Sequence, residues 1–547
     1  MTILIKNIQL LDGSGRPPVK ADILVKDEKI SAIGIFPKYR ADEIIDGFGA
    51  YLAPGFIDIN TDSDHYLTLF SNPAQADFLL QGVTTIIGGQ CGASLAPLLY
   101  GSLESISEWA DISKINVNWH TVKEFLETMD KRPLGVNFGT LIGHTTIRQA
   151  LVGETKRDLS RNELRVFNLL LDKSLKDGAF GFSTGLGYSQ NRQTSYSEIK
   201  ALVETVSKQK ALYATHLRNE KRGLLSSVNE TIEIAKETGA KVLISHFRPI
   251  LGYGKDYDEA LELINKNTDK ADVYFDLYPF DTSTMLVYTF LPDWAQEGDR
   301  EVMLKDIGTP GLKEKILREL PRLRGEEIVI VSAPGNEYLI GKNLKKFSQN
   351  RNLNITEGLL TLMKLTNFRA VVFYKNISLK KVIKTLALDR AIVASNSASF
   401  REPEGTESAS PVTSIGMRYG ASWRKIIRPE RSYRTFIRFL ELAEKAPTPE
   451  GGRGPDSDAR SESRPRRRDR SVGKKIMPIE TAVYKITGLP AQRLGLRERG
   501  IIRDGYFADL VIFKDAEIRE VLVNGKRIVK DGKFQGILAG KILRRIS

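Results

Sequence analysis

Several apolar runs in this sequence end in a side chain that can bind a metal ion or form hydrogen bonds. The residues in these positions are Asn60, Cys91, His144, His216, His246 and Asn396. A thiolate and imidazoles are good ligands for zinc and other transition metals, whereas a neutral amide is a poor one. The sequence therefore predicts metal chemistry if the fold brings some of these residues together.

The apolar runs have the length of buried β-strands and alternate with helix-like segments. Besides YLAPGFIDIN at 51–60, they lie at 83–89, 136–144, 178–184, 211–216, 241–246, 272–279 and 390–396. Helical patterns fall between several of them, for example at 198–210 and 225–238. Eight strands with intervening helices predict an α/β fold, a TIM-like (β/α)8 barrel. Such barrels carry their chemistry at the C-terminal ends of the strands, where the polar residues occur.

Both ends of the chain have a different pattern. Residues 1–53 and 496–547 alternate apolar and polar residues in short runs, which is typical of antiparallel strands joined by turns. We expect the two ends to share one small β-domain and the barrel to occupy 54–495. The interval from about 286 to 385 is too long for one strand–helix step, so it predicts an insertion that lies over the mouth of the barrel.

Residues 446–475 are rich in Pro, Gly, Ser and Arg, and Val472 is their one large apolar residue. This composition predicts a disordered insert, because it cannot form a packed core. The insert and the net charge of +14 also raise the hypothesis of nucleic-acid binding. No zinc-finger spacing, aromatic RNA-binding pattern or helix-turn-helix signal supports it, so we expect no nucleic-acid partner.

The composition is that of an ordinary globular protein, with 41% hydrophobic residues among 547. No uncharged apolar stretch reaches the roughly 18 residues of a membrane span, so we expect no membrane association. The N-terminus shows no signal-peptide pattern, and a single cysteine excludes an intramolecular disulfide. These features favour a cytoplasmic location, and they leave the oligomeric state open.

Ten stretches, in this order along the chain, resemble the N-acyl-D-amino-acid deacylase (D-aminoacylase) branch of the amidohydrolase superfamily. They are PGFIDINTDSD, QGVTTIIGGQCGASLAP, LIGHTTIRQA, GAFGFSTGLGY, YATHLRNE, VLISHFRP, LYPFDTST, RSYRTFIRFL, TAVYKITGLPAQRLGLRERG and GYFADLVIF. The resemblance covers about 1–445 and 476–547. It implies a TIM-like barrel with a small β-sandwich formed from both termini, and zinc-dependent hydrolysis of the amide bond of N-acylated D-amino acids.

The resemblance also implies a set of metal ligands. The tightly held zinc of the family corresponds to Cys91, His216 and His246, and three protein ligands with one open position suit a catalytic zinc site. A weaker second site uses a His-x-His pair, which is here Asn60 and Asp62, together with a strand-8 aspartate. We therefore expect one tight zinc site and a second site that is weak or absent.

The most consequential departure from the family is Asn396, which stands in place of that strand-8 aspartate. The aspartate moves a proton from the zinc-bound water to the leaving amine, and an amide cannot accept that proton at neutral pH. Loss of a positioned acid–base group typically costs about 10²- to 10⁴-fold in rate. We treat Asn396 and Asp62 as the catalytic candidates, with the hypothesis that Asp62 or Asp64 replaces the missing base.

The substrate contacts implied by the resemblance are Arg431, Tyr278, Ser283 and Arg248. Arg431 corresponds to the arginine that holds the substrate carboxylate, and a planar guanidinium suits that contact. Tyr278 and Ser283 correspond to residues that hold the carbonyl and carboxylate, although their spacing is one residue shorter here. Arg248 stands where a lysine is usual.

Three further polar residues are assigned supporting roles. Arg218 and Glu220, in the stretch THLRNE, are expected to orient the loop of His216 rather than to contact substrate. His144 matches a family position that is not a ligand, so we expect it to be structural.

These observations favour a zinc-dependent amidohydrolase that cleaves the C–N bond of N-acyl amino acids, with N-acyl-D-amino acids as the expected substrates. The alternative is a catalytically impaired relative that binds a metal or a small acylated ligand. Asn60 and Asn396 favour the alternative, whereas the complete cysteine and histidine set favours the enzyme. The sequence does not distinguish the acyl group, the amino-acid side chain or the D from the L series.

Overall fold

The computed structural model describes residues 1–546 except 108, 154, 156, 299, 401–413, 420–421 and 445–474. The insert predicted to be disordered, 446–475, lies outside the described residues apart from its last residue. Among the residues that are described, no helix has the length and apolar character needed to cross a membrane.

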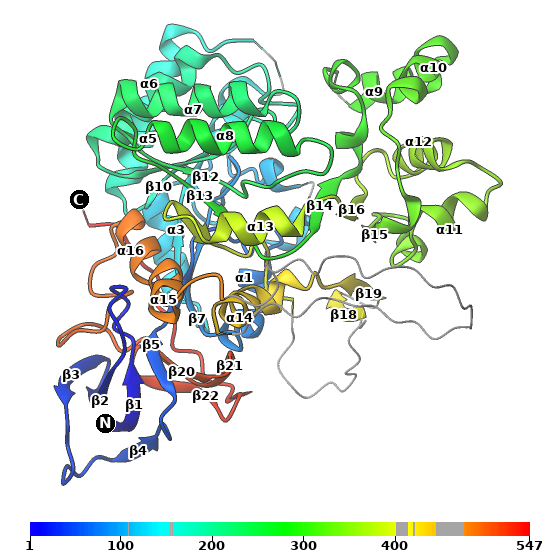
Figure 1. Ribbon diagram of the computed structural model, residues 1–547. Helices are drawn as coiled ribbons and strands as arrows, with labels where there is room; N and C mark the ends of the chain where they lie inside the picture. Colours follow the sequence, from blue (N-terminus) through cyan, green and yellow to red (C-terminus); the bar gives the residue numbers. More distant parts are fainter. Residues whose placement is uncertain are drawn as a thin grey trace, which may run out of the picture.

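The two chain ends contribute to one nine-stranded sheet, drawn in blue and red in Figure 1. Its strand order is β23-β22-β21-β20-β5-β1-β2-β3, with β4 paired to β1. The N-terminal strands are β1 (Thr2–Leu10), β2 (Val19–Lys26), β3 (Lys29–Gly34), β4 (Glu43–Asp46) and β5 (Tyr51–Pro54). The C-terminal strands are β20 (Leu510–Lys514), β21 (Glu517–Val523), β22 (Lys526–Lys530) and β23 (Lys533–Phe534). The antiparallel pair β5–β20 joins the two sets.

Parallel strands form the centre of the molecule. They are β6 (Phe56–Asp58), β7 (Val83–Gly88), β8 (Asn137–Thr140), β9 (Ile142–Gly143), β10 (Gly181–Gly185), β11 (Leu212–His216), β12 (Lys241–Ile244), β13 (Val273–Leu277) and β17 (Ala391–Val393). One sheet runs β6-β7-β8 and the other runs β17-β13-β12-β11-β10-β9. The two are linked where Phe180 N donates to Thr140 O (2.9 Å) and where Thr61 and Ser397 form a parallel bridge. The order of pairing therefore returns to its first strand.

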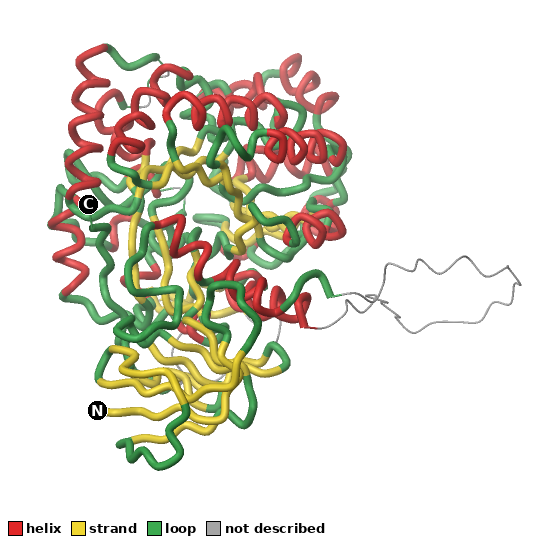
Figure 2. The backbone as a smooth tube through the Cα atoms, turned by 60° about the vertical axis from the view of Figure 1, so that its left-hand side comes forward, coloured by secondary structure: helices red, strands yellow, loops and turns green. Residues whose placement is uncertain are grey.

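Helices alternate with these strands and cover their outer side (Figures 1 and 2). The longer ones are α3 (Val122–Asp130), α4 (His144–Val152), α5 (Arg161–Lys176), α6 (Tyr196–Lys208), α7 (Leu224–Thr238), α8 (Gly254–Lys266), α13 (Leu379–Leu386), α14 (Arg431–Glu444) and α15 (Ile479–Ile486). Short helices include α1 (Thr68–Ser71), α2 (Ala76–Leu79) and α16 (Gly488–Leu494). Helix α5 starts at a capping box in which Ser160 and Glu163 satisfy each other's backbone N–H groups.

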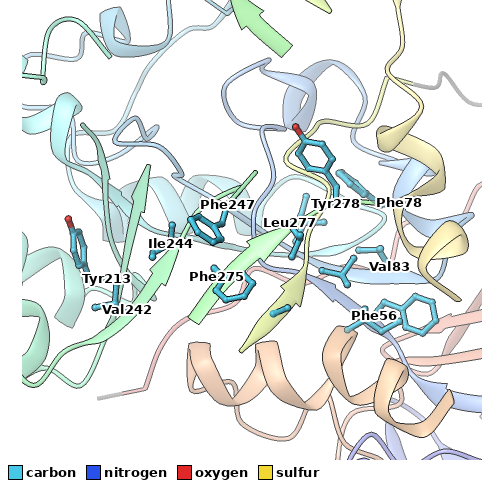
Figure 3. Close-up of a cluster of buried hydrophobic side chains, with 14 of the residues drawn as sticks. Phe56, Phe78, Val83, Tyr213, Val242, Ile244, Phe247, Phe275, Leu277 and Tyr278 are labelled. Carbon is cyan, nitrogen blue, oxygen red and sulfur yellow. The ribbon is translucent and has the colours of Figure 1, made fainter. Parts of the chain in front are cut away.

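The core lies between the parallel strands and the helices around them. Figure 3 shows side chains from neighbouring strands in this layer, among them Val83, Ile244, Phe275 and Leu277, all of which are buried. Every residue of β7 is buried, as expected for a parallel strand that is covered on both faces.

The stretch 51–60, predicted as one strand, is two strands that belong to different sheets. Strand β5 pairs in the terminal sheet and β6 pairs with β7, and Gly55 separates them. A Cβ atom at Gly55 would lie 2.1 Å from the Thr84 hydroxyl, so a side chain cannot be accommodated at this crossing. The glycine allows the chain to pass directly from the terminal sheet into the parallel one.

A lobe with its own hydrophobic cluster occupies the interval in which an insertion was predicted. It contains an antiparallel sheet of β14 (Thr282–Leu286), β16 (Val371–Lys375) and β15 (Ile328–Ser332). Its helices are α9 (Arg300–Gly308), α10 (Pro310–Glu319), α11 (Leu344–Gln349) and α12 (Ile355–Leu365). The lobe begins at β14 rather than at 286 and ends with β16, because α13 already packs against β17. A hairpin of β18 (Ser414–Tyr419) and β19 (Ser422–Ile427) follows later in the chain.

Candidate metal and catalytic site

The structure brings Cys91, His216 and His246 together at the C-terminal ends of three parallel strands. Cys91 follows β7, His216 ends β11 and His246 follows β12. One ligand atom from each residue lies within 4.8 Å of the other two. Cys91 Sγ is 3.5 Å from His246 Nε2, and the two imidazole rings are 4.4 Å apart at an angle of 86°.

The backbone is bent sharply to present these side chains. The backbone is in the left-handed region at Cys91 (φ 51°), His246 (φ 39°) and Asn396 (φ 46°). Residues other than glycine rarely adopt this conformation. Residues held in such conformations cluster at functional sites, because the surrounding structure must compensate for the strain. Gly187 provides room for the second imidazole, since a Cβ there would lie 2.6 Å from His216 Nε2.

These residues fit a zinc ion. Zinc binds sulfur at about 2.3 Å and imidazole nitrogen at about 2.0–2.1 Å, so small side-chain movements would bring all three atoms to one ion. Burial and the neighbouring His216 lower the pKa of His246 to about 3, which keeps its ring in the neutral, ligating form. The Nδ1 atom of His216 is buried and has no hydrogen-bond partner in the described part of the chain. Burial, with Asp62 and Asp276 nearby, raises the pKa of the Cys91 thiol, so a thiolate there requires a cation.

Glu220 links the two histidines to Arg248. Its carboxylate lies 3.3 Å from His246 Nδ1 and 3.7 Å from His216 Nε2. Arg248 donates to it from both Nε (3.2 Å) and Nη2. Burial alone would raise the pKa of Glu220, but Arg248 and the two imidazoles outweigh it and hold the pKa well below its usual value. Arg218 instead pairs with Glu230 at 2.7 Å.

The predicted second metal site holds a hydrogen-bonded amide. Asn60 is buried, and its Nδ2 donates to the carboxylate of Asp276 at 3.1 Å. The same carboxylate accepts from His246 N at 2.9 Å, and burial raises the pKa of Asp276 to about 7. Sequence reasoning missed Asp276, although an acidic residue inside the apolar run VYFDL was a signal that it has a specific partner.

The two candidate bases, Asp62 and Asp64, lie in different surroundings. Asp62 lines the cavity at the metal-ligand cluster, and its Oδ1 lies 3.6 Å from His65 Nδ1. Asp64 points the other way and accepts from Gly89 N at 2.5 Å. His65, a second residue that sequence reasoning missed, lines the same cavity, and its Nε2 lies 3.1 Å from Ala93 O.

Arg431, at the start of α14, stands beside these groups. Its Nε donates to Asn396 O at 3.1 Å, and its Nη2 donates to the Thr284 hydroxyl at 2.8 Å. Its guanidinium carbon lies 5.0 Å from the centre of the Tyr278 ring.

Thr284, rather than the predicted Ser283, lines the cavity next to Arg431. Successive residues of β14 point to opposite faces, and Ser283 is buried with its hydroxyl bonded to Asn376 at 2.6 Å. Thr284 is one residue further from Tyr278 than Ser283 is, which offsets the one-residue shorter spacing noted in the sequence.

The cavity at the metal-ligand cluster has a volume of about 150 Å³. Besides Cys91 and the two histidines, its walls carry polar residues that converge on one space: Asp62, His65, Glu220, Arg248, Asn396 and Arg431. Imidazoles, a thiol, carboxylates and guanidinium groups around a small space suit hydrolysis of a bond in an anionic substrate. His144 lies elsewhere, buried with Nε2 2.9 Å from Glu198, as expected of a structural residue.

Comparison with known proteins gives similarity over nearly the whole chain. D-aminoacylase of Alcaligenes xylosoxydans xylosoxydans is 27% identical, with 99% of this chain and 97% of that protein covered. N-acyl-D-aspartate deacylase of the same organism is 27% identical, with 94% and 86% covered. No family model matches the chain.

Solved structures show the same similarity. A crystal structure of D-aminoacylase, described as defining a novel subset of amidohydrolases, has a TM-score of 0.75 at 25% identity, with 99% of each chain covered. Another D-aminoacylase structure, from work on its binuclear metal center, has a TM-score of 0.74 at 25% identity over 99% of each chain. N-acyl-D-glutamate deacylase from Bordetella bronchiseptica, complexed with zinc and a phosphonate inhibitor, has a TM-score of 0.73 at 22% identity over 99% of each chain.

Proposed function

We propose that this chain, a homologue of the N-acyl-D-amino-acid deacylases as its sequence predicted, is a zinc-dependent amidohydrolase that cleaves the amide bond of N-acyl amino acids. The observation that carries this function is the cluster of Cys91, His216 and His246 at one end of the parallel strands. The expected substrates belong to the D series, since that is the series named for its relatives.

The proposed frame for the site is a (β/α)8 barrel over 54–495, with a β-sandwich built from 1–53 and 496–547. The returning order of strand pairs supports the barrel, and the shared nine-stranded sheet supports the terminal domain. One end of each parallel strand then faces the same space, which explains how residues more than a hundred positions apart meet there.

One zinc ion would be held by Cys91, His216 and His246. A zinc ion supplies Lewis acidity that activates a water molecule and the scissile carbonyl. Glu220 orients the two imidazoles, as carboxylates commonly do for metal-bound histidines, and Arg248 fixes Glu220. A second ion is expected to bind weakly or not at all, because the Asn60 amide is turned toward Asp276.

Arg431 is proposed to hold the substrate carboxylate, with Thr284 and Tyr278 beside it. The guanidinium is buried, which strengthens a charged hydrogen bond, and it faces the same cavity as the metal-ligand cluster. Arg248 also lines this cavity, but two of its nitrogens already donate to Glu220, so its first role is to position the site.

Asp62 is proposed to take the place of the missing strand-8 aspartate as general base. Its carboxylate accepts the proton that the attacking water loses, the hydroxide adds to the carbonyl carbon, and the same proton passes to the nitrogen as the C–N bond breaks. His65 lies beside this carboxylate and is itself tied to Ala93 O, so it holds Asp62 in place. Asn396 lines the cavity but cannot perform this transfer.

The direct test combines metal analysis of the purified protein with amine release from N-acetyl-D- and N-acetyl-L-amino acids. About one zinc per chain with stereoselective hydrolysis supports the proposal. Stoichiometric zinc without turnover of any N-acyl amino acid would favour the impaired relative instead. The further expectations, a cytoplasmic location, a small-molecule substrate and no nucleic-acid or membrane partner, remain predictions from the sequence, which leaves the oligomeric state open.

A further inference from the structure

Cationic side chains outnumber carboxylates in the lining of the cavity at the metal-ligand cluster. Among the residues that the structure describes, the cations are Arg192, Arg218, Lys221, Arg248 and Arg431. The carboxylates of the same lining are those of Asp62, Glu220 and Asp293. An excess of positive charge in a small cavity favours a ligand that brings negative charge with it.

Only some of these cations have a carboxylate partner within the described part of the chain. The pairs are Arg248–Glu220, Arg192–Asp293 (2.9 Å) and Arg218–Glu230 (2.7 Å). Arg431 donates instead to two neutral oxygens, those of Asn396 O and the Thr284 hydroxyl. The ammonium of Lys221 forms no hydrogen bond or ion pair with any described residue. Arg431 is the proposed partner of the substrate α-carboxylate, so Lys221 is the cation that this role leaves over.

Lys221 and Arg431 belong to different parts of the cavity wall. Lys221 lies in the loop that follows β11, and its neighbour Glu220 contacts both imidazoles of the metal-ligand cluster. Arg431 is bonded to Asn396 O, just after β17, and β13 and β12 separate β17 from β11 in the sheet. His246, which follows β12, therefore comes between the two cations in the order of the strands.

Hydrogen bonds within its loop hold Lys221 in place. The side-chain oxygen of Asn219 accepts from Lys221 N (2.8 Å) and from Gly223 N (3.2 Å), and Asn219 N donates to the Ser227 hydroxyl (3.0 Å). Lys221 is half-buried in this position. Because the loop is ordered before a ligand arrives, binding at the ammonium costs little additional entropy.

The cavity wall near Lys221 is polar. Besides Asn219, it carries Thr289, Asp293 and Gln296 of the lobe. The Nε atom of Arg192 is buried and has no hydrogen-bond partner in the part of the chain that is described. Burial lowers the pKa of Lys221; Asp293 and Glu220 oppose this, whereas Arg192 and Arg248 add to it. An alkyl chain against this wall would leave its polar groups without partners, whereas a carboxylate would accept hydrogen bonds from them.

We propose that Lys221 binds a second carboxylate of the substrate, which is carried by the acyl group. This deepens the proposed function and rests on it. With the α-carboxylate at Arg431 and the scissile carbonyl at the metal-ligand cluster, the acyl group extends beyond the metal ligands to the wall that carries Lys221. The cavity of about 150 Å³ has room for a short acyl chain. The substrates are therefore N-acyl amino acids whose acyl group is a short dicarboxylic acid such as succinate, and hydrolysis with one water molecule releases that dicarboxylate and the amino acid.

The test compares three derivatives of D-leucine with zinc-loaded protein: N-succinyl, N-succinamoyl and N-acetyl. The succinamoyl group has the size of succinyl but ends in a neutral amide. Lys221→Met removes the ammonium and keeps an unbranched side chain, and Lys221→Gln is a second, polar replacement. Arg222→Met is the matched control, because Arg222 is the next residue, is exposed and does not line the cavity.

In the wild-type protein we expect kcat/KM to be at least about tenfold higher for the succinyl than for the succinamoyl compound. Lys221→Met and Lys221→Gln should lower this ratio at least about fivefold and leave kcat/KM for the acetyl compound within about threefold, whereas Arg222→Met should keep the ratio within about twofold. Equal kcat/KM for the two compounds in the wild type, or a ratio that survives in both Lys221 variants, overturns the proposal. A preference for N-acetyl-D-glutamate over N-acetyl-D-glutamine that is lost in Lys221→Met also overturns it, because the amino-acid side chain would then carry the second carboxylate.

A binding measurement separates this inference from the proposed function. The shift in Tm on addition of each compound is recorded in parallel with the assays. If no N-acyl amino acid is hydrolysed, the proposed function fails. The carboxylate site at Lys221 is still supported if the succinyl compound raises Tm more than the succinamoyl compound does, and if Lys221→Met but not Arg222→Met removes the difference. Equal shifts in Tm for the two compounds would refute the site.

Discussion

Replacement of Asp62 by asparagine tests how this protein moves a proton without the strand-8 aspartate. Asp62 is a carboxylate that faces the cavity of the metal-ligand cluster and lies 3.6 Å from His65, whereas position 396 carries an amide. Asparagine keeps the size of the side chain and removes its ability to accept a proton. We therefore expect kcat to fall by about 10²- to 10⁴-fold, the usual contribution of a positioned acid–base group. At about 1.36 kcal/mol per factor of ten, this corresponds to roughly 3–5 kcal/mol of transition-state stabilisation.

Asp64→Asn is the matched control for this experiment. Asp64 is two residues away and carries the same side chain, but its carboxylate accepts from Gly89 N and does not line the cavity of the metal-ligand cluster. An asparagine oxygen can accept the same hydrogen bond, so turnover is expected to stay within about a factor of three. The zinc content and Tm of both variants should match those of the wild type, which excludes a loss through unfolding.

A rescue variant makes the assignment more specific. Asn396→Asp places a carboxylate at the same cavity on the neighbouring strand end, where Asn396 N donates to Asn60 O and Asp62 N donates to Ser397 O. In the Asp62→Asn background it should recover at least tenfold in kcat, because the cavity again contains a carboxylate that is not tied to Arg248 and the two histidines, as Glu220 is. The assay is steady-state amine release from an N-acetyl-D-amino acid. Turnover of Asp62→Asn within twofold of the wild type would refute the reasoning, and loss of turnover in Asp64→Asn to the same extent would show that the effect is not specific to the cavity.

Three other outcomes follow from the same structure. Cys91→Ala should reduce the zinc content from about one per chain to well below half, and metal analysis after dialysis measures it. Asp64→Asn should retain the zinc. Full retention of zinc by Cys91→Ala would exclude the thiol as a ligand. Arg431→Ala should raise KM for an N-acyl amino acid about 10- to 150-fold, since a hydrogen bond to a charged group contributes roughly 1.5–3 kcal/mol. The KM for the uncharged amide of the same compound should change little. Burial lowers the pKa of Lys485 to about 8, so between about pH 8 and 10 the folded chain binds fewer protons at this residue than the unfolded chain. The free energy of unfolding of the wild type should therefore rise relative to Lys485→Met by up to about 1.4 kcal/mol per pH unit in urea titrations, and parallel pH curves would contradict this.

The amino-acid sequence alone was sufficient to predict the parallel strands and the residues that end them. Apolar runs such as 83–89 and 241–246 have the length of strands rather than of helices. A strand that is buried on both faces is a nearly continuous apolar run, and such a run can be recognised from the sequence alone. Because the C-terminal ends of parallel strands face one space, the strand pattern predicts that residues at those ends lie near one another, and the resemblance to the deacylases selects Cys91, His216 and His246 among them. The ligand atoms of these three do lie within 4.8 Å of one another.

The orientation of the remaining side chains depended on contacts between distant parts of the chain, which local patterns do not record. Ser283 and Thr284 differ by one position in a strand, and only the pairing of β14 with β16 decides that Thr284 faces the cavity. Asp62 and Asp64 are equivalent in the sequence, but the turn that follows β7 captures Asp64 and leaves Asp62 at the cavity.

A second cavity, of about 550 Å³, likewise exists only in the folded protein. Its walls come from residues near 66–70, from the loop around 109 and from strands of the lobe at 331 and 371–373, segments that no periodicity connects. The sequence by itself determined which residues end the predicted strands, because strand ends are a local property, and its resemblance to the deacylases indicated which of them would bind zinc. The tertiary structure decided which carboxylate, hydroxyl and apolar groups surround them, because side-chain direction and enclosed volume depend on strand register and on long-range packing.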